Sequence, residues 1–126
     1  MTMTEVKSYR DLMVWQKSMD LVVICYKLTS QFPKTEIYGL SSQIQRAAVS
    51  IPANIAEGKG RNHLGDYIRH LSIANGSLKE LETHLMIVGR LGYLKDEELK
   101  VTLNKCEEIG RMLHSLMEKL AQKKKE

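Results

Sequence analysis

Gln43-Ile-Gln-Arg-Ala-Ala-Val-Ser-Ile-Pro-Ala-Asn-Ile-Ala-Glu-Gly-Lys-Gly-Arg61 is the stretch of the chain that decides its fold. Apolar side chains recur in it at spacings of three and four, which puts them on one face of a helix: Ile44, Ala48, Ile51 and Ile55. Polar side chains recur in the same way on another face: Gln43, Arg46, Ser50, Asn54, Glu57 and Arg61. Alanines fill most other positions and let neighbouring helices approach closely. The stretch therefore predicts a helix packed inside a helical protein.

Pro52 lies in the middle of this predicted helix. It has no N–H to bond the carbonyl of Ala48, its ring crowds that carbonyl, and it costs about 3 kcal/mol relative to alanine. We therefore expect a kink or a short break between Ser50 and Pro52, and we expect Gly58 and Gly60 to end the helix. The kink is either tolerated within a packed bundle or aims polar side chains at a partner: Arg46, Asn54, Glu57 and Arg61.

The composition indicates one all-helical domain spanning residues 1–126, with a loose N-terminal arm at about 1–7 and a basic tail at about 121–126. The chain has two prolines, one phenylalanine and few β-branched runs. Its net charge of +4 permits either nucleic acid or an acidic protein as a partner. Cys25 and Cys106 form no CxxC motif and are expected to be buried in a reducing cytoplasm. No apolar run reaches the ~18 residues of a membrane helix, so we expect a soluble cytoplasmic protein with no membrane partner.

Three further helices are predicted from apolar seams at helical spacing. Ser8 is expected to cap the first, with Asp11 completing a capping box. The seam of this helix is Leu12, Trp15, Met19, Val22 and Tyr26, and Leu21, Ile24 and Leu28 widen it, so the helix is expected to be buried on more than one side. Surplus apolar residues suggest a subunit interface: Met13, Val14 and Val23. The third helix, capped by Asn62, has the seam Tyr67, Leu71, Ala74, Leu78, Leu81, Leu85 and Val88. The fourth, capped by Asp96, has the seam Leu99, Leu103, Cys106, Ile109, Leu113, Leu116 and Leu120. Short connections then predict an antiparallel up-down-up-down four-helix bundle.

The signature segment, Ser50-Ile-Pro-Ala-Asn-Ile-Ala-Glu-Gly58, together with Gly60-Arg61, resembles that of the four-helix-bundle proteins encoded in intervening sequences of bacterial 23S ribosomal RNA genes. Other pieces agree in order, among them Asp11-Leu-Met-Val-Trp15, Phe32-Pro33, Gly39-Leu-Ser-Ser-Gln43 and Leu71-Ser-Ile-Ala74. The resemblance implies a homo-oligomer, with a pentamer favoured. The sequence is similar also to accessory variability-determinant proteins of diversity-generating retroelements, which implies a reverse transcriptase as an alternative partner.

Motifs for catalysis are missing from the sequence: it has no Walker loop, no HExxH and no GxSxG. We therefore expect a non-enzyme without a cofactor. His63, Asp66 and His70 share one face of the third predicted helix, which makes a weak metal site conceivable. A fourth ligand is not evident, so no metal site is predicted.

The residues predicted to bind a partner are basic and lie in or near the signature segment: Arg46, Lys59, Arg61 and Arg69. Arginine forks suit phosphate as well as carboxylate. Asn54 and Glu57 have a structural alternative, in which they satisfy backbone groups freed by Pro52 or, for Glu57, pair with Arg61. Two functional hypotheses follow. One is a nucleic-acid-binding oligomer, with structured RNA preferred over DNA, and the other is a protein-interaction scaffold.

Overall fold

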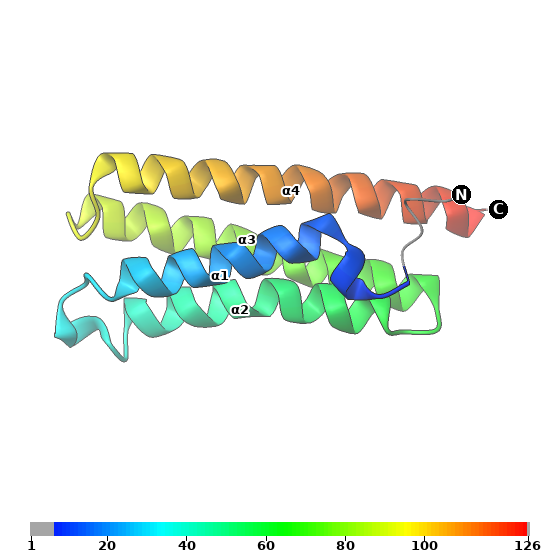
Figure 1. The fold of residues 1–126 in the computed structure, drawn as a ribbon, viewed down its shortest axis with the longest axis horizontal. Helices are drawn as coiled ribbons and strands as arrows, with labels where there is room; N and C mark the ends of the chain where they lie inside the picture. Colours follow the sequence, from blue (N-terminus) through cyan, green and yellow to red (C-terminus); the bar gives the residue numbers. More distant parts are fainter. Residues whose placement is uncertain (1–6, 126) are drawn as a thin grey trace.

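The chain folds into four antiparallel α-helices, as seen in a computed structural model that describes residues 7–125. The elements are η1 (Tyr9–Asp11), α1 (Met13–Thr29), η2 (Lys34–Glu36), α2 (Leu40–Lys59), α3 (Leu64–Arg90) and α4 (Asp96–Lys125). Within residues 7–125 there is no strand. Figure 1 shows successive helices running in opposite directions along the bundle, which confirms the predicted all-α bundle. The predicted N-terminal arm lies, apart from Lys7, outside the described residues.

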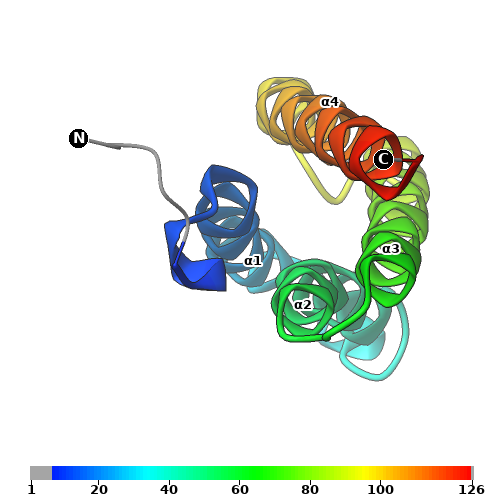
Figure 2. The same cartoon turned by 90° about the vertical axis from the view of Figure 1, so that its right-hand side faces the viewer.

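The four helices are arranged as an arc in chain order (Figure 2). α2 and α3 share the most extensive interface, while α1 packs on α2 and α4 packs on α3. The ends of the arc, α1 and α4, face each other across a groove that an ion pair from Lys17 to Glu108 bridges at 3.2 Å. The basic tail is not separate from the bundle, because α4 stays helical through Lys125.

The core is built mainly from the predicted seams of α2 and α3. All seven predicted seam residues of α3 are buried, as are Ile44, Ala48, Ile51 and Ile55 of α2. In α4 the fully buried residues are Thr102, Cys106, Ile109 and Leu113, so its C-terminal third is only partly covered. The core is therefore most completely buried where α2, which contains the signature segment, packs against α3.

The predicted seam of α1 is right only in part. Leu21 and Leu28, which widen it, are buried, and Leu12, Trp15 and Val22 are partly buried against the core. The buried stripe is Val14, Ser18, Leu21, Cys25 and Leu28, while two members of the predicted seam, Met19 and Tyr26, are exposed. A serine can take a core position here because the Ser18 hydroxyl donates a hydrogen bond to the carbonyl of Val14 at 2.7 Å. Val14 is thus a core residue, and the exposed apolar surface of α1 includes Met13 and Val23 as predicted.

Three predicted helix starts also differ from the structure. Asp96 does not precede α4 as its cap but is its first helical residue. Ser8 and Asp11 do form a capping box, but it caps η1, because Leu12 adopts an extended conformation before α1 begins. Asn62 does not cap α3. The N-cap is His63, and its side chain makes no capping hydrogen bond.

α2 continues from Leu40 to Lys59 with Pro52 inside it, so the short break expected at the proline does not occur. The kink itself stays a prediction. Gly58 does not end the helix but lies buried within its last turn, and Gly60 caps it with an ordinary right-handed conformation at φ −79°. No helix within the described range is both long and apolar enough to span a membrane.

Candidate nucleic-acid interface

The signature segment is bonded to α3 by a chain of polar contacts. The hydroxyl oxygens of Ser50 and Ser77 lie 2.8 Å apart, across the α2–α3 interface. The side-chain amide of Asn54 donates to the carbonyl of Ser50 at 2.9 Å and lies 3.1 Å from its hydroxyl oxygen. The sequence offers backbone groups freed by Pro52 as partners for Asn54, but the carbonyl that Asn54 bonds, that of Ser50, is not the one that Pro52 frees. Asn54 is nevertheless held in one orientation by these bonds.

The orientation of the Asn54 side chain determines which of its atoms forms a hydrogen bond with a buried histidine. Because the amide nitrogen of Asn54 is used for donation, its oxygen is left to accept from Nδ1–H of His70, 3.0 Å away. His70 is only 5% exposed, and its Nε2 faces the carboxylate of Glu57 at 3.6 Å and the guanidinium of Arg69 at 3.4 Å. The α2–α3 polar network thus consists of Ser50, Ser77, Asn54, His70 and Glu57.

Glu57 and Arg61 form the ion pair that the sequence predicted, with a separation of 2.7 Å. The hydrogen bond from Arg61, followed by the charge of His70, lowers the pKa of Glu57 below its ordinary value of 4.5. Glu57 therefore remains ionised at neutral pH and neutralises part of the positive charge at this end of α2.

Gly58 lets α2 and α3 approach closely. A Cβ at this position would lie 2.8 Å from the Cβ of His70 and 3.2 Å from the carbonyl oxygen of Tyr67. Both are rigid parts of α3, so a larger residue would force the helices apart. Together with the polar network, this contact gives Ser50, Asn54, Glu57 and Gly58 a structural role in joining α2 to α3.

Basic side chains from two distant parts of the sequence meet at the end of the bundle where α2 turns into α3. A cavity of about 190 Å³ lies there, which we call the basic pocket. Its lining residues are Lys59, Arg61, Asn62, His63, Leu64, Tyr67, Leu120 and Lys123. The Lys59 ammonium lies 5.9 Å from the centre of the Tyr67 ring. The antiparallel packing of α4 brings Lys123 to Lys59 and Arg61, although the sequence separates them by more than sixty positions.

The other two predicted binding residues lie outside this pocket. Arg46 is exposed on α2, thirteen positions before Lys59 and hence about 20 Å away along the continuous helix. Arg69 is exposed on α3 beside His70. The structure therefore brings Lys59 and Arg61 together with Lys123, and it separates Arg46 from them.

The three residues considered for a metal site do not form one. His70 is buried and bonded to Asn54, whereas His63 lies at the start of α3 and lines the basic pocket. Over the described part of the chain, no three His, Cys, Asp or Glu side chains are grouped so that they could hold a metal ion.

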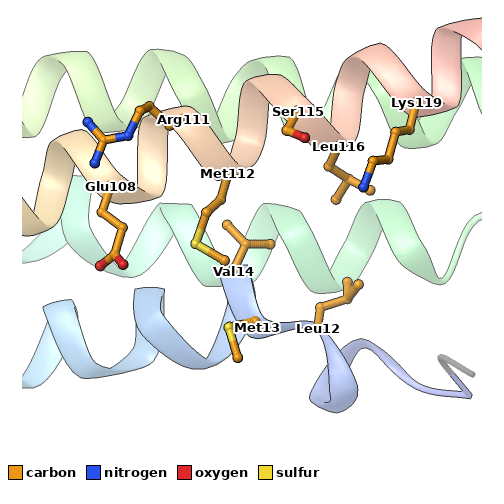
Figure 3. A pocket seen from close by; sticks show the side chains of 9 residues that line it. All are labelled: Leu12, Met13, Val14, Glu108, Arg111, Met112, Ser115, Leu116 and Lys119. Carbon is orange, nitrogen blue, oxygen red and sulfur yellow. The ribbon is translucent and has the colours of Figure 1, made fainter. Parts of the chain in front are cut away.

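A second concave surface is the groove between α1 and α4. It has a volume of about 470 Å³, and its walls are mostly apolar, with Met13 and Val14 on one side and Met112 and Leu116 on the other. Figure 3 shows Met112 pointing toward α1, with charged side chains along the α4 rim.

The fold and the candidate site together define a class of protein. It is an all-α four-helix bundle in which the α2–α3 polar network joins α2 to α3 and basic side chains gather where α2 turns into α3. The chain belongs to the 23S rRNA-intervening sequence protein family, whose model matches residues 10–115. It is also similar to a solved structure from Bacteroides thetaiotaomicron VPI-5482, a protein of unknown function from the S23 ribosomal protein family. The two share 29% identity and a TM-score of 0.78, over 83% of this chain and 95% of the other. No curated protein matches the chain.

Proposed function

We propose that this protein is a non-enzymatic, homo-oligomeric nucleic-acid-binding protein, that structured RNA is its preferred ligand over DNA, and that it acts in the cytoplasm. The observation that carries the proposal is the basic pocket, where Lys59, Arg61 and Lys123 converge on one end of the bundle. Cationic side chains grouped in this way contact phosphates. The free, buried Cys25 and Cys106 agree with a reducing compartment.

Self-association is part of the proposal because one subunit offers few phosphate contacts. Exposed apolar side chains on α1, among them Met13, Met19 and Val23, provide a surface suited to a neighbouring copy. In the pentamer that we favour, the basic pocket would be repeated five times. Repetition raises the local positive potential and allows one RNA to engage several subunits at once.

RNA binding across a salt series tests the proposal. The logarithm of the affinity should fall with the logarithm of the salt concentration, with a slope of about −0.7 to −0.9 for each phosphate contacted. The double variant Lys59→Gln/Lys123→Gln should bind more weakly and with a flatter slope. The matched control, Lys100→Gln/Lys105→Gln, removes two exposed lysines elsewhere on α4 and should leave the slope unchanged. Failure of the intact oligomer to bind RNA or duplex DNA at low salt would refute the proposal.

The alternative function is a protein-interaction scaffold, such as an accessory subunit of a reverse transcriptase. The observation that favours it is the apolar groove between α1 and α4, because methionine-lined grooves adapt to apolar segments of partner proteins. Co-purification with a reverse transcriptase, lost in Met112→Glu and retained in Lys59→Gln/Lys123→Gln, would favour this alternative.

A further inference from the structure

The basic pocket has a definite size and lining, which restrict what it can hold. Three cationic side chains line it, each from a different element of the fold: Lys59 at the end of α2, Arg61 in the connection between α2 and α3, and Lys123 on α4. Within the described residues, none of its eight lining side chains is a carboxylate. Of the acids close in sequence to this end of the bundle, Glu57 is already paired with Arg61, and Asp66 lies in the first turn of α3 without lining the pocket. An anion in the pocket would therefore be attracted from several sides without an opposing charge on its wall.

The start of α3 adds backbone donors at the same place. The first N–H groups of an α-helix have no partner within the helix, and they form the positive end of its dipole. The N-cap residue His63 makes no side-chain hydrogen bond to them, and both His63 and Leu64 line the pocket. Free backbone donors thus lie beside the three cations, which is the combination that phosphate groups favour.

The pocket is too small for a whole nucleotide. Its volume of about 190 Å³ lies below the roughly 300–1,000 Å³ of sites that enclose small organic ligands. The side chains of Leu64 and Leu120 further reduce the polar surface of the pocket, because they provide no hydrogen-bond partners for the hydroxyl groups of a sugar. A single phosphate group fits these limits.

We propose that the basic pocket is a phosphate-binding subsite that holds one phosphate group between Lys59, Arg61, Lys123 and the N-terminus of α3. The phosphate can come from an end of an RNA chain or from its backbone, and to that extent the proposal rests on the proposed function. The subsite itself requires only the phosphate, so inorganic phosphate is a sufficient probe.

The experiment titrates the full-length oligomer with inorganic phosphate in a calorimeter at constant ionic strength. We expect saturable binding of one phosphate per subunit. Lys123→Gln should weaken it about tenfold, as loss of a hydrogen bond to a charged group does. Lys100→Gln, on the exposed face of the same helix, is the control and should bind as the wild type does. Undetectable binding, or equal binding by wild type and Lys123→Gln, would overturn the subsite.

A second arm compares one RNA sequence with a 5′-phosphate and with a 5′-hydroxyl. A preference for the 5′-phosphate that disappears in Lys123→Gln identifies a chain end as the source, whereas equal binding of both RNAs, weakened by Lys123→Gln, identifies the backbone. If RNA binds and inorganic phosphate does not, the subsite is wrong while the proposed function stands. If inorganic phosphate binds and RNA does not, the proposed function is wrong while the subsite stands.

Discussion

Replacing Gly58 with alanine should destabilise the bundle by forcing α2 away from α3. The new Cβ would lie 2.8 Å from the Cβ of His70 and 3.2 Å from the carbonyl oxygen of Tyr67, and neither can move without shifting α3. Overpacking of this kind costs about 1–3 kcal/mol. The better helix propensity of alanine returns about 1 kcal/mol, so the expected net effect is a loss of up to about 2 kcal/mol.

Gly76→Ala provides the matched control. Gly76 lies in α3, and a Cβ there would meet no atom within 4 Å, so this variant should gain about 1 kcal/mol from propensity alone. The gap between the two variants isolates the clash at Gly58. Thermal unfolding at one fixed protein concentration measures it, with roughly 3–6 °C expected per kcal/mol for a chain of this size. If Gly58→Ala melts as high as Gly76→Ala, the close approach of α2 and α3 is refuted.

Three further predictions follow from the same interfaces. Asn54→Ala should lower the free energy of unfolding by about 1–3 kcal/mol, measured by urea denaturation, because it leaves Nδ1 of the buried His70 without its partner. The lowered pKa of Glu57 contributes stability that is fully present above about pH 4.5 and is lost as pH falls through the folded pKa. Between pH 6 and pH 3 the melting temperature of Glu57→Gln should therefore fall less than that of the wild type. An equal fall in both proteins would contradict the pairing of Glu57 with Arg61. Burial raises the pKa of Cys25 and of Cys106 to about 12, so both thiols should resist a thiol reagent at pH 8 until the chain unfolds.

The seam of α3 was predictable from the sequence because its buried positions other than His70 are apolar or small, at regular spacing. The seam of α1 was predictable only in part, since Ser18 occupies a core position and conceals the period that links Val14 to Leu21. Only the hydrogen bond from Ser18 to the carbonyl of Val14 makes that position compatible with burial. Likewise, Gly58 looked like a helix terminator because its packing partners belong to a different helix.

The candidate site was predictable in part. Lys59 and Arg61 can be identified from the sequence because they lie close together at the end of the signature segment, whereas the sequence places Lys123 only in a separate tail. Its place beside them depends on α4 returning antiparallel to α3, which no local pattern specifies. His70 could have been linked to Asn54 only through the register of α2 against α3. The positions of these side chains relative to one another thus depend on tertiary contacts, which the local spacing of residues does not specify.

Hydrogen–deuterium exchange of the protein with and without structured RNA tests the central claim most directly, because it locates the bound surface. The account predicts that RNA slows exchange at the end of α2, the start of α3 and the last turns of α4, around Lys59, His63 and Lys123. Peptides near Arg46 should change little. Protection confined to the groove between α1 and α4, with none at the basic pocket, would contradict the account.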